Sequence, residues 1–204
     1  MTFVLQHPAL VAAFTWQHVV IVITALAIAL AIAFPLAVVA ARSTRLETSL
    51  LGFLGALYTV PSLALLAILV RYEGLGFWTL VSALVAYAQF ILVRNFATGL
   101  RAVSVAQKDA ATGLGMSSSQ RLWRVELPQA LPIMLGGVRI AAISLIAIAT
   151  LGGWISAGGL GDLIFAGIRQ DYIQKTIAGS MASAVLAVAA DLVLRSFEKR
   201  VRRD

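Results

Sequence analysis

Long apolar runs alternate along this chain with short polar segments. The apolar core of a bilayer is about 30 Å thick, and a helix of about 20 mostly apolar residues crosses it. Five runs meet this requirement, at residues 19–41, 50–70, 74–93, 133–151 and 177–194. The pattern predicts an all-α integral membrane protein with five transmembrane helices within residues 17–195. A segment over residues 1–16 precedes this domain, and a basic tail over residues 196–204 follows it.

Composition supports the membrane assignment. Of the 204 residues, 60% are hydrophobic and 12% are charged, whereas soluble domains carry roughly 25% charged residues. The net charge of +7 comes from basic residues at the ends of apolar runs, and not from a basic face of the kind that binds nucleic acid. The chain has no cysteine, and its two histidines have no metal-ligand spacing with a carboxylate. We therefore expect neither a nucleic-acid partner nor a metal site.

The sequence also lacks the common motifs of nucleotide binding and hydrolysis. No Gly-x4-Gly pattern precedes any of its three lysines, so a phosphate-binding loop is absent. A metalloprotease His-Glu pattern and a nucleophile elbow are absent as well. We expect a protein that is not an enzyme, and any ATP and Mg²⁺ that it depends on would be bound by another chain.

The distribution of basic residues predicts the orientation in the membrane. An odd number of spans places the termini on opposite sides, and Lys and Arg accumulate in cytoplasmic loops. If the N-terminus is outside, twelve basic residues face the cytoplasm: Arg42, Arg45, Arg94, Arg101, Lys108, Arg121, Arg124, Arg195, Lys199, Arg200, Arg202 and Arg203. Three then lie outside, namely Arg71, Arg169 and Lys175. The count predicts that residues 1–16 are extracytoplasmic and that the loop 101–128 and the tail are cytoplasmic.

Two charged residues fall inside the predicted spans. Asp191 lies one turn before Arg195, so an i,i+4 ion pair at the inner interface accounts for it. Arg139 is near the start of its span and can extend its side chain toward the cytoplasm. Pro35 and Pro61 also lie inside spans, where the missing N–H permits a kink. The fourth and fifth spans are rich in Gly, Ala and Ser, which predicts close packing between helices.

The polar segment from Asp109 to Pro132 predicts two short helices joined by a glycine bend. Residues 113–115 read Gly-Leu-Gly, and glycine disfavours a helix interior by about 1 kcal/mol. Ser117 followed by Gln120 forms a capping-box pattern. We therefore expect the second helix to begin near residue 118 and to end at Pro128, and the next span to begin at Pro132.

The apolar side chains of this second helix, Leu122 and Trp123 among them, need a covering surface. One interpretation is that the helix lies on the membrane, where Arg121 and Arg124 contact lipid phosphates. The other is that it docks into a groove on a soluble partner. The residues by themselves favour neither.

The same segment resembles the loop that identifies ABC importer permeases, which reads Glu-Ala-Ala, three residues, Gly, nine residues, then Ile-x-Leu-Pro. Here the residues at the matching positions are Asp109, Ala110, Ala111, Gly115, Val125, Leu127 and Pro128, with the same spacing throughout. Asp replaces Glu and Val replaces Ile. The resemblance implies the type I importer permease fold, and it implies that residues 101–128 form the coupling loop.

In that family the coupling loop docks on the ATPase subunits. The resemblance thus implies the following coupling residues: Asp109, Ala110, Ala111, Gly115, Leu122, Trp123, Leu127 and Pro128. It also implies the other partners, which are an extracytoplasmic substrate-binding protein and a second copy of this permease or a sister permease, all in a lipid bilayer. The localisation implied is the plasma membrane of a bacterium or archaeon.

Several further stretches are similar to one branch of the family, the permeases for osmoprotectants such as glycine betaine, choline and carnitine. They are "VPSLALLAIL" (60–69), "VRNFATGLRAV" (93–103), "SAGGLGDLIFAGI" (156–168) and "ADLVL" (190–194). The branch implies import of a compatible solute. Methionine-type permeases share the five-span layout and a similar glycine-rich stretch, so a methionine-type or other small-solute permease is the alternative. A channel or carrier that works without an ATPase is the alternative from a different class.

The glycine-rich segment between the last two spans is the candidate outer gate and binding-protein contact, with Gly158, Gly159, Gly161 and Asp162 as its residues. Apolar residues recur at helical spacing from Leu160 to Ile168, which predicts a short amphipathic helix. A plain connecting loop is the other interpretation. Trp78 and Tyr87 point to opposite faces of the third span, which excludes an aromatic cage built on that helix alone, so no substrate-contacting residue is assigned.

Overall fold

The computed structural model describes residues 2–201, so the predicted basic tail is described only as far as Val201, and Arg202 and Arg203 lie outside it. The helices of the membrane domain are α1 (Thr2–Gln6), α2 (Pro8–Ala41), α3 (Thr44–Thr59), α4 (Ser62–Glu73), α5 (Phe77–Ala102), α8 (Leu127–Ala149) and α10 (Ile173–Val201). The segments between them hold α6 (Val105–Gly113), α7 (Ser118–Arg121), a π-helix η1 (Leu122–Glu126), a 3-10 helix η2 (Thr150–Trp154) and α9 (Leu160–Arg169). The described residues contain no strand, which confirms the all-α prediction.

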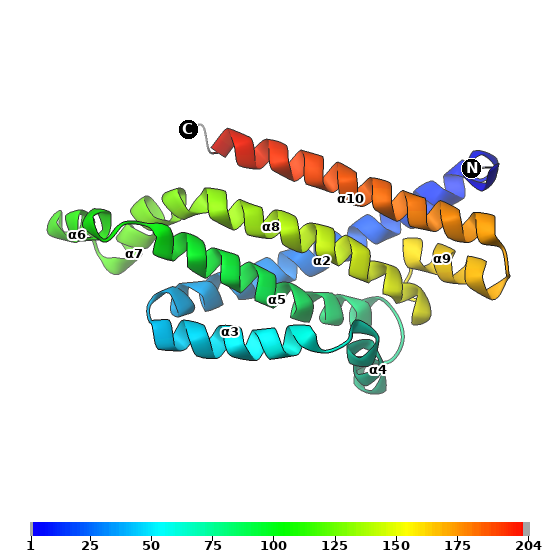
Figure 1. Cartoon of the computed structure of the whole chain (residues 1–204), viewed down its shortest axis with the longest axis horizontal. Helices are drawn as coiled ribbons and strands as arrows, with labels where there is room; N and C mark the ends of the chain where they lie inside the picture. The colour runs from blue at the N-terminus through cyan, green and yellow to red at the C-terminus, as the bar shows by residue number, and fades with distance from the viewer. Residues whose placement is uncertain (1, 202–204) are drawn as a thin grey trace.

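The long helices run side by side along one axis of the molecule (Figure 1). Helices α6 and α7 lie at one end of that axis, and α4 and α9 lie at the other. The start of α2 and the end of α10 lie at opposite ends, as an odd number of crossings requires (Figure 1). The first of the long helices is α2, which begins at Pro8 and so extends well before the predicted start at residue 19. The chain there, "PALVAAFTWQH", is apolar enough to continue the helix.

Four helical segments are long and apolar enough to cross a membrane, and a fifth crossing is possible if the bent pair α3 and α4 forms one span. The predicted span at residues 50–70 contains a sharp bend at Pro61, where a kink was expected. Helices α3 and α4 meet at 91°, because Pro61 has no backbone N–H and holds Val60 in an extended conformation with ψ 129°. Pro35, in contrast, lies within α2 without ending it.

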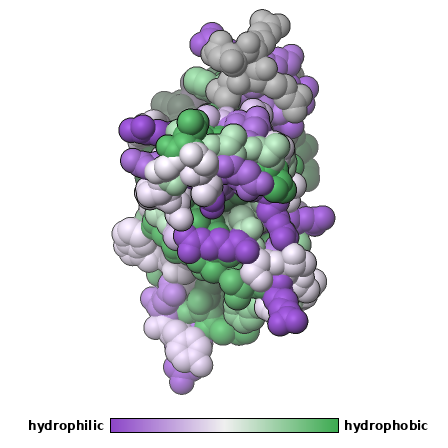
Figure 2. Space-filling model, turned by 90° about the vertical axis from the view of Figure 1, so that its left-hand side faces the viewer, coloured by the Kyte–Doolittle hydropathy of each residue, from purple (hydrophilic) through white to green (hydrophobic). Residues whose placement is uncertain are grey.

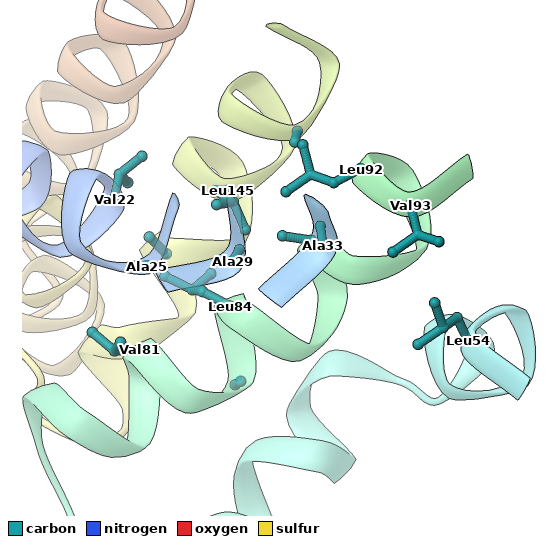
Figure 3. Close-up of a cluster of buried hydrophobic side chains, with 14 of the residues drawn as sticks. Val22, Ala25, Ala29, Ala33, Leu54, Val81, Leu84, Leu92, Val93 and Leu145 are labelled. Carbon is teal, nitrogen blue, oxygen red and sulfur yellow. The ribbon is translucent and has the colours of Figure 1, made fainter. Parts of the chain in front are cut away.

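An alanine stripe on α2 forms the centre of the core. Ala25, Ala29, Ala33 and Ala37 recur every four residues, and each is fully buried. They lie against α5, from which Val81, Leu84, Leu92 and Val93 enter the same cluster (Figure 3). Small side chains bring helix backbones close together, which is how helices associate in lipid. The stripe was not identified in the sequence, because its residues lie within a uniformly apolar run.

Glycines bring α8 and α10 close to their neighbours, as the small residues of these spans predict. A side chain on Gly137 of α8 would collide with Asn95 of α5. A side chain on Gly179 of α10 would lie 2.7 Å from a side-chain carbon of Ile164 on α9. Gly136, one residue before Gly137, has open space around it. The close approach therefore depends on particular glycines and not on the composition of the span.

Charged side chains join α8 to α10. Arg195 donates to Asp191 at 2.9 Å, which confirms the predicted i,i+4 pair. Arg139 of α8 donates to the other oxygen of Asp191 at 3.2 Å and lies 3.4 Å from Glu198. Arg139 was expected to extend toward the cytoplasm, and its pairing with Asp191 and Glu198 was not predicted. Two carboxylates on α10 compensate its charge and connect the two helices.

Candidate functional site

Helices α6 and α7 are joined by a bend whose geometry follows from the sequence. The N–H of Met116 donates to the carbonyl of Ala111, and the N–H of Gly115 donates to that of Thr112. This is the Schellman arrangement, which needs a left-handed residue after the helix. Gly115 supplies it, with φ +77°. The glycine bend predicted at residues 113–115 is thus confirmed.

The predicted capping box starts α7. The Ser117 hydroxyl accepts from the N–H of Gln120 at 3.3 Å, and the Gln120 side chain accepts from the N–H of Ser117 at 2.8 Å. The predicted end of this helix at Pro128 is wrong. The chain passes through the π-helix η1 directly into α8, which takes Pro128 into its first turn and continues through Pro132. The helix is continuous across these residues, so the missing N–H groups of Pro128 and Pro132 do not end it.

The α6–α7 segment is tied together by a few polar contacts. Arg121 donates to Glu126 at 2.8 Å and to the hydroxyl of Thr112 at 3.2 Å, and so joins α7 to α6. Lys108 donates to the carbonyl of Leu100 at the end of α5, at 3.1 Å. Because Arg121 already has protein partners, the structure gives less support to its proposed contact with lipid phosphates.

The predicted coupling residues divide into a buried and an exposed set. Ala111 is buried, and Leu122 and Leu127 pack against the core. Asp109, Ala110 and Pro128 are exposed. Trp123 is 57% exposed, and its ring lies 5.8 Å from that of Phe34 in α2. The structure therefore presents α6 and the Trp123 ring outward while Leu122 and Leu127 anchor the segment.

The surface of this end is mixed in character. Figure 2 shows hydrophilic side chains over the end of the molecule that carries α6 and α7, with apolar side chains between them. Leu114 at the bend is 79% exposed and Val105 at the start of α6 is 72% exposed. Exposed apolar side chains ringed by polar ones are typical of a protein contact surface.

At the opposite end of the bundle, α9 confirms the predicted amphipathic helix. It runs from Leu160 to Arg169, with Leu160, Leu163 and Gly167 buried. Its first N–H groups are held by side chains of α2. Gln17 accepts from the N–H of Gly159 at 3.2 Å, and the Nδ1 atom of His18 accepts from the N–H of Leu160 at 3.3 Å.

His18 joins three elements. The ring is fully buried, and its Nε2 atom lies 3.0 Å from the carbonyl of Ile146 in α8. Since Nδ1 accepts from Leu160, Nε2 must carry the proton and donate to Ile146, which defines the neutral tautomer. An interfacial or solvated role expected for His18 is wrong, because its partners lie 128 and 142 residues further along the chain and no local pattern identifies them.

The glycines predicted at the outer gate have distinct structural roles. Gly158 and Gly159 have φ +90° and +73°, a conformation that other residues rarely adopt. A side chain on Gly159 would lie 3.0 Å from His18 Nδ1, and one on Gly161 would collide with the Thr150 carbonyl. Gly153 is confined in the same way, because a side chain added there would collide with the Gly161 backbone. These glycines let η2 and α9 pack backbone against backbone.

Asp162 is the charged member of the predicted outer set. One of its carboxylate oxygens, Oδ1, is buried without a hydrogen-bond partner among the described residues. Burial raises the pKa of the Asp162 carboxyl, and the Gly158 backbone amide and the Arg169 charge oppose this rise. A carboxylate kept in this condition is a candidate ligand-binding group.

An aromatic cluster lies where α3 breaks from α4. The Tyr87 hydroxyl of α5 donates to the carbonyl of Val60 at 2.5 Å. The Tyr58 ring of α3 lies 5.9 Å from that of Tyr87 and 5.3 Å from that of Phe90. These rings pack on each other beside the break, and we assign the cluster to the stability of the break.

Comparison with known proteins identifies the class of this one. Residues 33–203 match the family model described as the binding-protein-dependent transport system inner membrane component. The chain therefore belongs to that family, and it is a multi-pass membrane permease subunit of an ABC importer that works with other transporter subunits.

Particular relatives agree over nearly the whole chain. It is 34% identical to the carnitine transport permease protein OpuCB of Listeria monocytogenes, over 92% of this chain and 86% of the relative. It is also 34% identical to the osmoprotectant import permease protein OsmW of Salmonella typhimurium, over 96% of this chain and 94% of the relative. The inward-facing methionine transporter MetNI has a similar fold, with a TM-score of 0.85 at 18% identity over 96% of this chain and 98% of that one.

Proposed function

We propose that this chain forms the transmembrane pathway of an ATP-driven importer for compatible solutes with a quaternary ammonium group, of the glycine betaine, choline and carnitine type. The observation that carries the proposal is the similarity, over 92% of the chain, to permeases named for carnitine and choline transport. The likeness to a methionine transporter supports the fold alone, because the identity is 18%.

The α6–α7 segment is the proposed contact with the ATPase subunits, which would bind ATP and Mg²⁺. Its exposed apolar side chains, Val105, Leu114 and Trp123, support this role. The η1 helix supports it as well, because α7 continues through η1 into α8. A displacement of α7 would therefore move α8 directly. ATP-driven closure of the ATPases would open the pathway outward, and hydrolysis would reset it.

The opposite end of the bundle is proposed to receive solute from an extracytoplasmic binding protein. Orientation with the N-terminus outside is favoured by the excess of basic residues at the α6–α7 end. Two copies of this chain, or one copy with a sister permease, would enclose the pathway between them.

The proposal is tested by reconstitution of the permease with its companion ATPase and binding protein in liposomes. We expect uptake of labelled choline or glycine betaine that requires ATP and both partners. Uptake by the permease without ATP would instead support a carrier, and ATP-dependent uptake of methionine with no uptake of quaternary amines would support the methionine-type alternative.

A further inference from the structure

An open cavity of about 630 Å³ lies at the α9 end of the bundle. Ligand pockets in proteins commonly have about 300–1,000 Å³. Phe14 and Trp16 of α2 and Phe77 of α5 line it, together with Ser156 and Asp162. Three elements that are distant in sequence thus contribute aromatic rings and a carboxylate to one space.

The carboxylate in this cavity lacks an ion-pair partner. Among the described residues, Asp162 forms no ion pair, and only the Gly158 backbone amide and the charge of Arg169 offset the effect of its burial. A cation in the cavity would compensate this charge.

The backbone around the cavity is held in place by defined contacts. Ser156 on its edge has φ +53°, a strained conformation for a residue other than glycine. The Gly158–Gly159 turn that leads to Asp162 is fixed by Gln17 and His18 of α2. Strain that persists because the surroundings enforce it is typical of ligand sites.

We propose that this cavity binds the quaternary ammonium group of a solute at the outer end of the permease. This inference rests on the proposed function. Aromatic ring faces attract such cations, which have no N–H group to donate. Asp162 would supply the opposite charge. A solute that also carries a carboxylate, such as glycine betaine, would be repelled by Asp162 and bind more weakly.

The test is choline binding to the permease alone, by calorimetry, in nanodiscs of phosphatidylglycerol and phosphatidylethanolamine. We expect saturable binding of choline and none of 3,3-dimethyl-1-butanol, its uncharged isostere. Asp162→Asn should weaken choline binding about tenfold or more, and Trp16→Leu by a few-fold. Asp171→Asn, which changes an exposed carboxylate just after α9, is the matched control and should bind as the unmodified chain does.

Equal binding of choline and its isostere, or unchanged affinity in Asp162→Asn, would overturn the inference. A thermal unfolding midpoint measured for each variant separates lost binding from lost folding. Loss of choline binding in phosphatidylcholine nanodiscs would assign the cavity to a lipid headgroup and would also overturn it. If reconstituted uptake depends on ATP while choline does not bind the permease alone, the proposed function stands and this site alone is refuted.

Discussion

The two ends of the bundle are stabilised in opposite ways. The α6–α7 end is held by a few polar contacts, such as Arg121 with Thr112, and leaves apolar side chains such as Leu114 exposed. At the α9 end, glycines let backbones pack so closely that a side chain would not fit between them. Gln17 and His18 also accept hydrogen bonds from the start of the helix. The difference indicates that substitutions at the α9 end act first on folding, whereas those at the α6–α7 end act first on partner binding.

A large effect on folding is expected for Gly161→Ala. Its methyl group would collide with the Thr150 carbonyl, and overpacking of this kind costs about 1–3 kcal/mol. We expect a clearly lower thermal midpoint in detergent. The control is Gly136→Ala in α8, where the added methyl has open space and should leave the midpoint unchanged or raise it, since alanine favours helix. Equal midpoints for the two variants would contradict the backbone packing described for α9.

The candidate outer gate contains two of these tightly packed glycines. Bulky residues at Gly159 or Gly161 are predicted to reduce transport, but Gly159 lies against His18 and Gly161 lies against the Thr150 carbonyl. A transport defect there would reflect damaged folding as well as gating. Asp162 is the better probe, because its side chain lines a cavity.

A similar effect is expected for His18→Ala. The change removes the partners of two buried groups, the N–H of Leu160 and the carbonyl of Ile146. Each buried group left unpaired costs about 1–3 kcal/mol. Hydrogen exchange should become faster at the start of α9. The control is His7→Ala, at an exposed position, which should leave that exchange unchanged. Unaltered protection of Leu160 in His18→Ala would show that α9 does not depend on this bond.

A smaller effect is expected for the ion pairs between α8 and α10. Asp191→Asn weakens the contacts to Arg139 and Arg195 together, whereas Arg195→Gln removes one exposed pair, of about 0–1 kcal/mol. We expect Asp191→Asn to lower the thermal midpoint more than Arg195→Gln, with a difference that shrinks as salt is added. Identical midpoints would mean that Arg139 gains nothing from Asp191.

The smallest expected effect is a pH dependence at Asp162. Because burial raises the pKa of this carboxyl, the folded protein binds its proton more tightly than the unfolded chain does. Stability from this group is present at low pH and falls as pH rises from the ordinary carboxyl pKa through the raised one. Asp162→Asn should remove that fall in a series of thermal midpoints, and a parallel series for both proteins would contradict the raised pKa.

Features set by neighbours in sequence were predicted well. The bend at Gly115, the capping box of Ser117 and Gln120, and the extent of α9 each depend on residues within one or two helical turns. Features that depend on distant pairing were missed. Gln17 and Gly159 are 142 residues apart, and Arg139 and Asp191 are 52 apart. Nothing in the local pattern of either residue identifies its partner.

Two prolines show the limits of a local pattern. A kink was expected at Pro61, but hydropathy measures how apolar a run is and not its direction, so the pattern did not give the 91° angle. Proline was also taken to end the helix at Pro128, although the helix continues through it from η1 into α8.

The central claim is that the α6–α7 end binds the ATPase, and Leu114→Glu tests it most directly. Leu114 is 79% exposed at the bend, so a charge there should not affect folding but should disrupt an apolar contact. The control is Leu75→Glu between α4 and α5, which is 69% exposed at the opposite end. In nanodiscs, we predict that Leu114→Glu weakens binding of the companion ATPase by about 30-fold or more, as loss of an interface hot spot does, and that Leu75→Glu does not. ATPase binding by Leu114→Glu as tight as by the unmodified chain would contradict the account.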